Sequence, residues 1–307
     1  MKKRSTPNSS TFRAINLIGD YWLLLLMREA LLGANRYNEF YKRLAITHAT
    51  LSDRLKRLVE GGLLTKSATA NNTNGPEEYR LTDMGRNLYV VLTMIRQWHQ
   101  RHPDLSGVEW LQGTFVHSEC GHAFEPRLAC TACGAEVHAD DVSSRPGPGA
   151  GIEPVVAMPV QRQVKVRKAG AERSVSGAVG IESDRWSIMI MAACFSGISR
   201  FGDFRERLFM SPHTLSNRLT LLTSQKMLTK RAYSSTPKRY EYILTAKGKD
   251  IYPIVASLMQ YGDRWLSSDG PPMLLQHNPC GSSLSAALQC SACMSPVGLE
   301  HLVFGIQ

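Results

Sequence analysis

Two segments of the chain carry the same set of one histidine and three cysteines at the same internal spacing. The sets are His117, Cys120, Cys130 and Cys133, within HSECGHAFEPRLACTACG, and His277, Cys280, Cys290 and Cys293, within HNPCGSSLSAALQCSACM. Each member of the second set follows its counterpart by 160 positions. Three thiolates and one imidazole make the tetrahedral ligand set of a structural zinc site, with no open position for a substrate. We therefore predict up to two structural zinc ions, one within each segment.

Other interpretations of these cysteines stay open. A metal-free subdomain whose cysteines only pack would contain the same residues, and the nine-residue gap between Cys120 and Cys130 is short for a zinc ribbon. A disulfide within either set would leave one of its three thiols unpaired. His122 is a competing ligand in the first segment, but the second segment has Ser282 at that position, which favours His117.

The cysteine sets belong to a longer internal duplication. The segment DYWLLLLMREALLGANRYNEFYKRLAITHATLSDRLKRLVEGGLLTK, from Asp20, aligns with DRWSIMIMAACFSGISRFGDFRERLFMSPHTLSNRLTLLTSQKMLTK, from Asp184. The offset between the copies is 164 here and falls to 163 and then to 160, as expected where turns differ in length. Residues 143–175, between the copies, are rich in Gly, Pro, Ser and basic residues, which predicts a linker with a short extended segment at Val164–Val166.

Each copy shows the local signals of a winged helix-turn-helix domain in the right order. In the first copy an apolar helix covers about residues 22–32, and a second helix follows with apolar residues at helical spacing from Tyr37. Thr47 caps a third helix with a leucine stripe. Two short strands then flank an Asn- and Gly-rich turn, and a long helix covers about 83–101. In the second copy Ser211, followed by a proline, marks the start of the third helix.

Three segments of each copy carry a resemblance to a known family. They are IGDYWLLLLMREALLGANRYNEF, LSDRLKRLVEGGLL and YRLTDMG in the first copy, and DRWSIMIMAACFSGISRFGDF, LSNRLTLLTSQKML and YEYILTAKG in the second. With these segments each copy resembles the HxlR-type winged helix-turn-helix family of bacterial transcription regulators. The resemblance implies a helical dimerisation surface and a recognition helix that enters the DNA major groove. Members of the family usually pair as homodimers of one-domain chains, so this chain is expected to form an intramolecular pseudo-dimer or a homodimer.

The expected fold class is mainly α with small β wings (α+β), in two tandem winged helix-turn-helix domains that are each followed by a small zinc-knuckle-like segment. The expected boundaries are 12–108 and 176–270 for the winged domains, 114–142 and 274–303 for the Cys/His knuckles, and 143–175 for the linker. Lys and Arg number 36 against 26 Asp and Glu, giving a net charge of +10. This balance favours an anionic partner such as nucleic acid.

The side chains that turn outward from the third helices are the candidate DNA contacts. They are His48, Thr50, Ser52, Arg54 and Lys56 in the first copy, and His213, Thr214, Ser216, Asn217 and Arg218 in the second. Hydroxyl, amide and guanidinium groups read base edges or hold phosphates. Simple solvent exposure is the alternative for each of them. For Arg54 and Arg218 a further alternative is an internal ion pair with a preceding helix.

The two wings differ in charge near their tips. Lys238 and Arg239 follow a proline in the second wing, where they can contact phosphates, whereas Glu77 and Glu78 stand near the corresponding point of the first. We expect the second wing to bind the DNA backbone and the first to contribute little beyond Lys66, because carboxylates repel phosphates. The alternative is that all four tip residues are solvated strand-end charges.

The function these features indicate is sequence-specific regulation of transcription on double-stranded promoter DNA, with no catalytic residues. The chain has no Gly-rich phosphate loop and no clear catalytic triad, and C-x-x-C lacks the βαβ context of a thioredoxin-like enzyme. The alternatives are a zinc- or thiol-dependent redox sensor and a protein-interaction adapter with secondary DNA binding. Without a signal peptide or an apolar stretch of roughly 18 residues, a cytoplasmic protein with no membrane partner is expected. Cys194, in an apolar helix, is expected to be buried rather than reactive.

Overall fold

The first copy contains the predicted helices and wing strands, preceded by one further helix. The computed structural model describes residues 5–67, 77–103, 113–154, 165–168, 171–174 and 184–305. In chain order the first copy has β1 (Ser5–Pro7), α1 (Ser10–Ile18), α2 (Tyr21–Leu31), α3 (Tyr37–Arg43), α4 (His48–Glu60), β2 (Leu64–Ser67), β3 (Glu78–Leu81), α5 (Asp83–Asn87) and α6 (Tyr89–Arg101). The helix α1 is not among the predicted elements. The long helix predicted at 83–101 is divided into α5 and α6 at Leu88.

The second copy repeats this order. It has α7 (Arg185–Phe195), α8 (Phe201–Leu208), α9 (Pro212–Ser224), β11 (Leu228–Ser235), β12 (Lys238–Leu244), α10 (Ala246–Lys249) and α11 (Tyr252–Trp265). Its last helix is divided like that of the first copy, and here Pro253 in the first turn of α11 has no N–H to continue the ladder from α10. The winged helix-turn-helix pattern predicted twice from the sequence is therefore present twice.

The third helix of each copy buries its predicted leucine stripe. The stripes are Leu51, Leu55 and Leu58 in α4, and Leu215, Leu219 and Leu222 in α9, all at most 1% exposed. The hydroxyls of Thr47 and Ser211 accept hydrogen bonds from the backbone N–H groups of Thr50 and Thr214, so both predicted N-caps are confirmed. Because the leucine stripe is buried and the N-cap fixes where each helix begins, the opposite face of each helix is turned to solvent.

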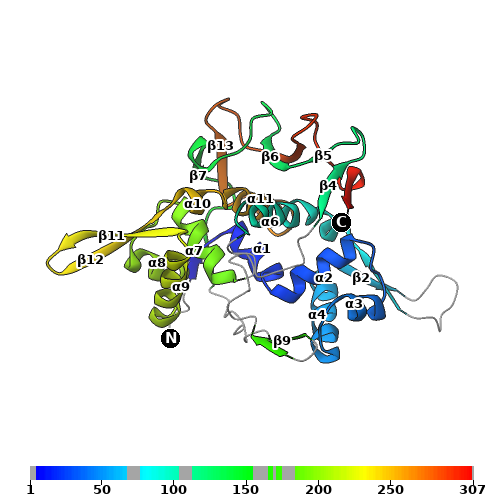
Figure 1. The fold of residues 1–307 in the computed structure, drawn as a ribbon. Coiled ribbons are helices and arrows are strands. Elements are labelled where there is room, and N and C mark those ends of the chain that lie inside the picture. The colour runs from blue at the N-terminus through cyan, green and yellow to red at the C-terminus, as the bar shows by residue number, and fades with distance from the viewer. Residues whose placement is uncertain are drawn as a thin grey trace.

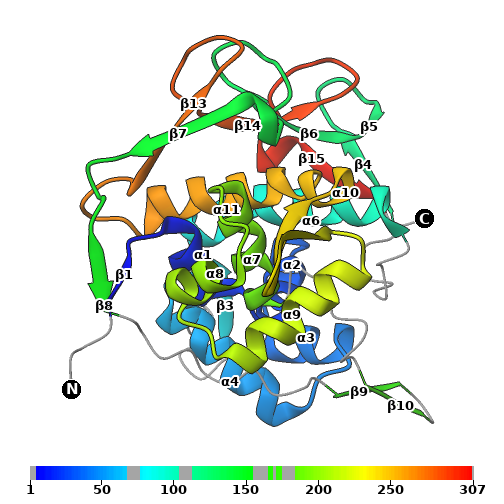
Figure 2. The same cartoon turned by 90° about the vertical axis from the view of Figure 1, so that its left-hand side faces the viewer.

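The two copies pack against each other through their first and last helices. α1 lies along α11, and α11 also contacts α6 (Figure 2). Gly262 of α11 permits the close approach, because a Cβ atom there would lie 2.2 Å from the carbonyl oxygen of Ser10. Across the same contact the Tyr261 hydroxyl donates to the Met84 carbonyl at 3.1 Å. The chain therefore forms a pseudo-dimer from its own two copies.

The Cys/His segments also join the two copies. They contain β4 (Thr114–His117), β5 (Ala123–Phe124), β6 (Pro126–Cys130), β7 (Val142–Pro146), β13 (Met273–His277), β14 (Ala286–Cys290) and β15 (Leu302–Gly305). β6 pairs antiparallel with β14, β4 with β15, and β7 with β13, so each of these three ladders links one copy to the other. Leu128 stands opposite Leu288, which follows it by 160 positions. The pseudo-two-fold axis of the chain therefore passes through this pair.

Part of the expected linker is strand. β7 lies at its start, β8 (Ile152–Pro154) pairs with β1, and β9 (Lys165–Lys168) pairs with β10 (Ala171–Ser174). The extended segment expected at Val164–Val166 overlaps β9, although residue 164 itself lies outside the described residues. The first part of this region is thus tied into the fold, because β7 supplies the partner strand of the second Cys/His segment.

Candidate nucleic-acid and metal sites

The recognition helices α4 and α9 lie on the same side of the molecule. Both are at the bottom in Figures 1 and 2, the Cys/His strands are at the top, and α1, α6 and α11 lie between them. The exposed predicted contacts are His48, Ser52 and Lys56 on α4, and His213, Ser216 and Asn217 on α9, while Thr50 and Thr214 are half-buried. One chain therefore presents both sets of candidate DNA contacts to a common side.

Two tyrosines of α3 orient the start of α4. The ring of Tyr41 stacks on that of His48, with 4.0 Å between the centroids. The Tyr37 hydroxyl lies 3.0 Å from Nδ1 of His48 and 3.2 Å from Oγ of Ser52. The sequence indicates only that these tyrosines lie at helical spacing, so their role in holding two candidate contacts was not predicted. The sequence does contain one signal for this role: both residues are tyrosines, whose hydroxyls a purely apolar packing stripe would not need.

The start of α9 is organised differently. The amide Nδ2 of Asn217 lies 3.1 Å from Nε2 of His213, one helical turn away. The counterparts of the two α3 tyrosines are Phe201 and Arg205, which carry no hydroxyl. The two recognition helices therefore present different polar groups to solvent, although they have the same position in their domains.

Arg54 and Arg218 are held by internal ion pairs. The Nε and Nη2 atoms of Arg54 each lie 3.1 Å from an oxygen of Asp20, which also caps α2. In the second copy Nε of Arg218 lies 2.7 Å from Oδ2 of Asp184, the residue before α7. For both arginines the structure shows the ion-pair alternative. Each ion pair therefore holds its recognition helix, α4 or α9, against the start of α2 or α7 in the same copy.

Replacing Arg54 should therefore act mainly on stability. We expect Arg54→Ala to lower the free energy of unfolding by about 1–3 kcal/mol, because Asp20, which is 7% exposed, loses its charged partner. Chemical denaturation measures the loss, and a double-mutant cycle with Asp20→Asn isolates the coupling of the pair. Lys56→Ala is the control: its side chain is 73% exposed and should change stability by less than about 0.5 kcal/mol. Equal losses for the two variants would contradict the positioning role of Arg54.

The carboxylates of the first wing are paired within the protein. Glu78 is buried, with Arg36 at 3.1 Å and Arg80 at 3.2 Å, and these two guanidinium groups hold its pKa below the usual value. Glu77 is exposed and lies 2.6 Å from the ammonium of Lys66. The expectation that both carboxylates face DNA is corrected for Glu78, which is turned into the domain. The tip of this wing, residues 68–76, lies outside the described residues.

The second wing carries unpaired positive charge. β11 and β12 form a ladder that projects from the body of the molecule (Figure 1). Lys238 and Arg239 are exposed at its end, in register with Ser235 and Ser234. Among the residues that the structure describes, neither has a carboxylate within ion-pair distance. Both cations are thus available to an anionic partner.

The eight predicted metal ligands come together in two groups, but the groups exchange partners between the copies. One group is His117, Cys120, Cys290 and Cys293, and the other is Cys130, Cys133, His277 and Cys280. Each group takes H-x-x-C from one copy and C-x-x-C from the other. The prediction of a complete ligand set within each segment is therefore wrong in its grouping. The cause is the antiparallel pairing of β6 with β14. Each of these strands ends at the first cysteine of a C-x-x-C, so the pairing places each C-x-x-C beside the H-x-x-C of the other copy.

The distances within the groups suit a tetrahedral metal ion. Sγ of Cys120 lies 3.9 Å from Sγ of Cys290, and Sγ of Cys130 lies 4.0 Å from Sγ of Cys280. A tetrahedron with zinc–sulfur bonds of about 2.3 Å has edges of about 3.8 Å, whereas a disulfide needs about 2.05 Å. In each group the histidine Nδ1 lies within 3.4 Å of a thiol of the other copy. All four donor atoms of each group lie within 4.8 Å of one another.

The surroundings of the ligands favour metal binding. His117 and His277 are fully buried, while His122, the competing ligand considered from the sequence, is exposed and belongs to neither group. The backbone N–H of Ser282 and the neighbouring His277 lower the pKa of Cys280 to about 6. The backbone N–H of Ser295 does the same for Cys293, so each group contains one thiol that ionises readily. Thiolate is the form that binds metal.

Two winged helix-turn-helix domains with their recognition helices exposed on a common side define a DNA-binding regulator of transcription. The chain belongs to the HxlR-like helix-turn-helix family, whose model matches residues 17–106 and again residues 181–270. Both matches coincide with the copies described above. The duplication found in the sequence is therefore a duplication of the family's domain.

The relatives of the chain are named as regulators. An uncharacterized HTH-type transcriptional regulator of Mycobacterium tuberculosis is 39% identical over 142 residues, which cover 46% of this chain and 87% of the relative. YvaP of Bacillus subtilis, another, is 33% identical over 90 residues, or 29% of this chain and 83% of the relative. A solved structure of PA1607, a proposed transcription factor, has 33% identity and a TM-score of 0.36, and the match covers 42% of this chain and 88% of that one. Among the described residues, no helix is both long and apolar enough to cross a membrane.

Proposed function

We propose that the protein binds promoter DNA sequence-specifically, with both recognition helices of one chain on the same duplex. The observation that carries this proposal is the position of α4 and α9 on a common side of the pseudo-dimer (Figures 1 and 2). The major groove returns to the same face of the duplex once per helical turn, so the two helices would occupy half-sites about 34 Å apart. A single chain would then do what a homodimer of one-domain chains does.

The two half-sites should differ in sequence. Where α4 has His48 and Lys56, α9 has Pro212 and Thr220 at the duplicated positions. A cation and a hydroxyl select different base edges, because the major groove presents a distinct pattern of donors and acceptors for each base pair. A homodimer of identical domains favours a symmetric operator. This chain, by contrast, is expected to prefer an asymmetric one.

Footprinting with one variant for each helix tests the proposal. Ser52→Ala with Lys56→Ala should weaken operator binding by about 1–3 kcal/mol and remove protection from one half-site only. Ser216→Ala with Asn217→Ala should do the same at the other half-site. Ser283→Ala, an exposed serine among the Cys/His strands, is the control and should leave the footprint intact. Full protection of both half-sites in both helix variants would contradict the proposal.

We also propose that both Cys/His groups hold structural zinc. Four protein ligands fill a tetrahedral shell, so the ion would have no open position for substrate and would act by linking ligands. Because each group draws two ligands from each copy, an ion in either group would join the two copies directly. The support for zinc is the ligand chemistry and the spacing of the donor atoms.

A further inference from the structure

The chain contains two versions of one cavity. A cavity of 130 Å³ lies between α1, α7, α8 and α11, and one of 90 Å³ lies at the equivalent place of the first copy. By the internal duplication, every residue that lines the smaller cavity has a counterpart that lines the larger one. Tyr89 corresponds to Tyr252, for example, and Leu302 to Val142. Differences between the two cavities are therefore differences at matched positions.

Two further residues of the larger cavity, Ala193 and Arg207, have counterparts that do not line the smaller cavity but differ from them in charge pairing. In the first copy Glu29 is 4% exposed and its carboxylate pairs with Arg28 and, at 3.4 Å, with Arg43. The counterpart of Arg43 in the second copy is again an arginine, Arg207. The counterpart of Glu29, however, is Ala193, which lines the larger cavity. The second copy has thus kept the guanidinium and lacks the carboxylate.

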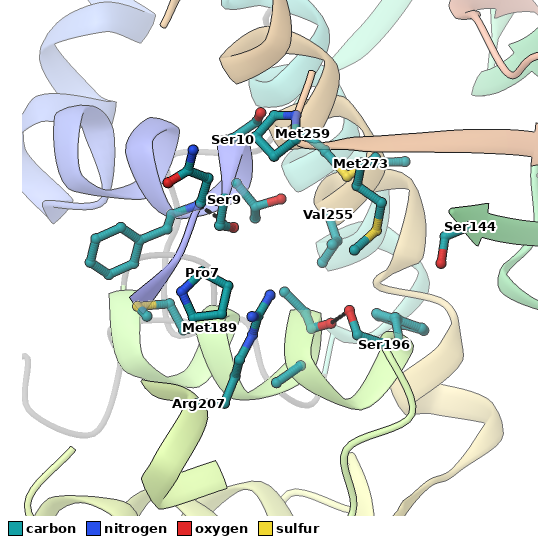
Figure 3. A pocket seen from close by; sticks show the side chains of 18 of the residues that line it. Pro7, Ser9, Ser10, Ser144, Met189, Ser196, Arg207, Val255, Met259 and Met273 are labelled. Carbon is teal, nitrogen blue, oxygen red and sulfur yellow. Dashed lines mark hydrogen bonds between the residues drawn. The ribbon is translucent and has the colours of Figure 1, made fainter. Parts of the chain in front are cut away.

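Arg207 extends from α8 into the larger cavity (Figure 3). Within the described part of the chain, no carboxylate lies within ion-pair distance of its guanidinium. Burial lowers the pKa of Arg207, the direction expected of a cation that lacks an anionic neighbour. The walls around it are mixed: Met189, Val255, Met259 and Met273 supply apolar surface, and serines such as Ser9 and Ser196 supply hydroxyls.

The second copy has more room because its side chains are smaller. In the first copy Arg96 lies over the rings of Phe115 and Phe304, with its Cζ atom 4.3 and 5.1 Å from their centroids. The counterparts of these two rings are Leu275 and Ser144, and the counterpart of Arg96 is Met259. A cavity of about 150 Å³ takes a benzene molecule, so the larger cavity has the scale of one small ring or a short alkyl chain.

We propose that this cavity binds a small amphipathic carboxylate. The ligand's carboxylate pairs with Arg207 as that of Glu29 pairs with Arg43, and its ring or alkyl chain lies against the methionines and Val255. Arg207 favours an anionic ligand because its guanidinium has no carboxylate partner among the described residues and pairs well with a planar carboxylate. The apolar part of the lining, formed by the methionines and Val255, and the size of the cavity favour a body of about six carbons.

The position of the cavity links a ligand to the recognition helix. Arg207 lies in the last turn of α8, and α9 begins four residues after α8 ends. The opposite wall belongs to α1 and α11, which join the two copies. A ligand held between them would therefore bias the position of α9 relative to the pseudo-dimer core. This effect on DNA binding rests on the proposed function, whereas the binding of the carboxylate does not.

Calorimetric titration of the full chain with benzoate and hexanoate, and with the neutral benzamide and hexanamide, tests the proposal without DNA. We expect at least one of the two carboxylates to bind with a dissociation constant of about 1 mM or tighter, and its amide to bind at least tenfold more weakly. Arg207→Gln should weaken binding of that carboxylate at least tenfold and leave the amide unchanged. Arg43→Gln, the same change at the matched position of the first copy, should leave carboxylate binding at its original strength.

A second variant guards against a folding defect in Arg207→Gln. Ala193→Glu supplies the carboxylate that the first copy has, so it should abolish binding of the carboxylate and raise the melting temperature. Absence of saturable binding by both carboxylates, equal binding of acid and amide, or binding that survives both variants overturns the proposal. The regulatory step is measured separately, as a change in operator affinity on adding the bound carboxylate that Arg207→Gln no longer shows. If a bound carboxylate left operator affinity unchanged, only the proposed regulatory effect would be overturned.

Discussion

Replacing Cys130 and Cys280 together by serine should remove one zinc ion from the protein, whereas replacing Cys130 and Cys290 together should remove both. The first pair belongs to one ligand group and the second pair is divided between the two groups. A tetrahedral site that loses one thiolate already loses most of its affinity, so a second loss in the same group adds little. Metal analysis of freshly purified, chelator-free protein counts the ions. Ligand sets within each segment would give different counts for two pairs. Cys130 with Cys280 would then remove both ions instead of one, and Cys120 with Cys130 would remove one ion instead of two.

The control for the metal count is Cys194→Ala. Cys194 lies in α7 and belongs to neither group, and burial raises the pKa of its thiol to about 12, so it is no ligand. This variant should keep two ions. Protein with no zinc at all before any substitution would show that the cysteines only pack, and the same metal analysis decides this.

Loss of either ion should also destabilise the whole pseudo-dimer. Apparent zinc-binding free energies in small zinc-dependent domains are about 10–16 kcal/mol, and binding is coupled to folding. Because each ion would hold two ligands from each copy, Cys290→Ser should lower the denaturation midpoint of both copies together. Independent unfolding of one copy in this variant would argue against the exchanged arrangement.

The elements of each winged domain could be predicted because their signals are local. The leucine stripe of α4, the cap at Thr47 and the cap at Ser211 depend on residues three or four apart, and all three are confirmed. The division of the last helix at Leu88 was missed, since no proline or glycine marks it there. In the second copy Pro253 marks the same division, and comparison of the copies would have revealed it.

The grouping of the metal ligands could not be predicted from spacing. H-x-x-C and C-x-x-C look the same in sequence whether they close on each other or on the matching segment of the other copy. The β6–β14 ladder decides which segments share a ligand group. This ladder joins strands about 160 residues apart, and such non-local pairing leaves no local signal in the sequence. The short gap between Cys120 and Cys130 was the one signal in the sequence, because it leaves few residues to close a ribbon within one segment.

The direction of charged side chains was predictable only in part. Glu78 was expected on the DNA side, while for Arg54 a DNA contact and an internal ion pair were both open, and each of the two is held by a partner inside the domain. Their partners Asp20 and Arg36 come from elements earlier in the chain, so no local pattern identifies the pairs. Lys238, at the end of the second wing, has no carboxylate within ion-pair distance among the described residues, and its side chain is exposed as predicted.

The change Lys238→Ala with Arg239→Ala should weaken DNA binding across all sequences and flatten its dependence on salt. Each phosphate that a protein cation neutralises contributes about 0.9 to the slope of the logarithm of affinity against the logarithm of salt concentration. Two exposed cations at the end of the second wing should therefore account for about one to two units of slope. Discrimination between operator and random DNA should change little, because phosphates carry no base information.

The first wing supplies the matched comparison. Glu77→Ala should leave affinity equal or tighter, since it frees Lys66, now 2.6 Å from that carboxylate, for a phosphate. A double change of Glu77 and Glu78 to alanine is a poorer comparison, because Glu78 holds Arg36 and Arg80 and its loss would also affect stability. The single variant changes only the exposed carboxylate of this wing. If the variant of the second wing kept the original slope and affinity over a salt series, its two cations would be solvated strand-end charges and the wings would not differ in function.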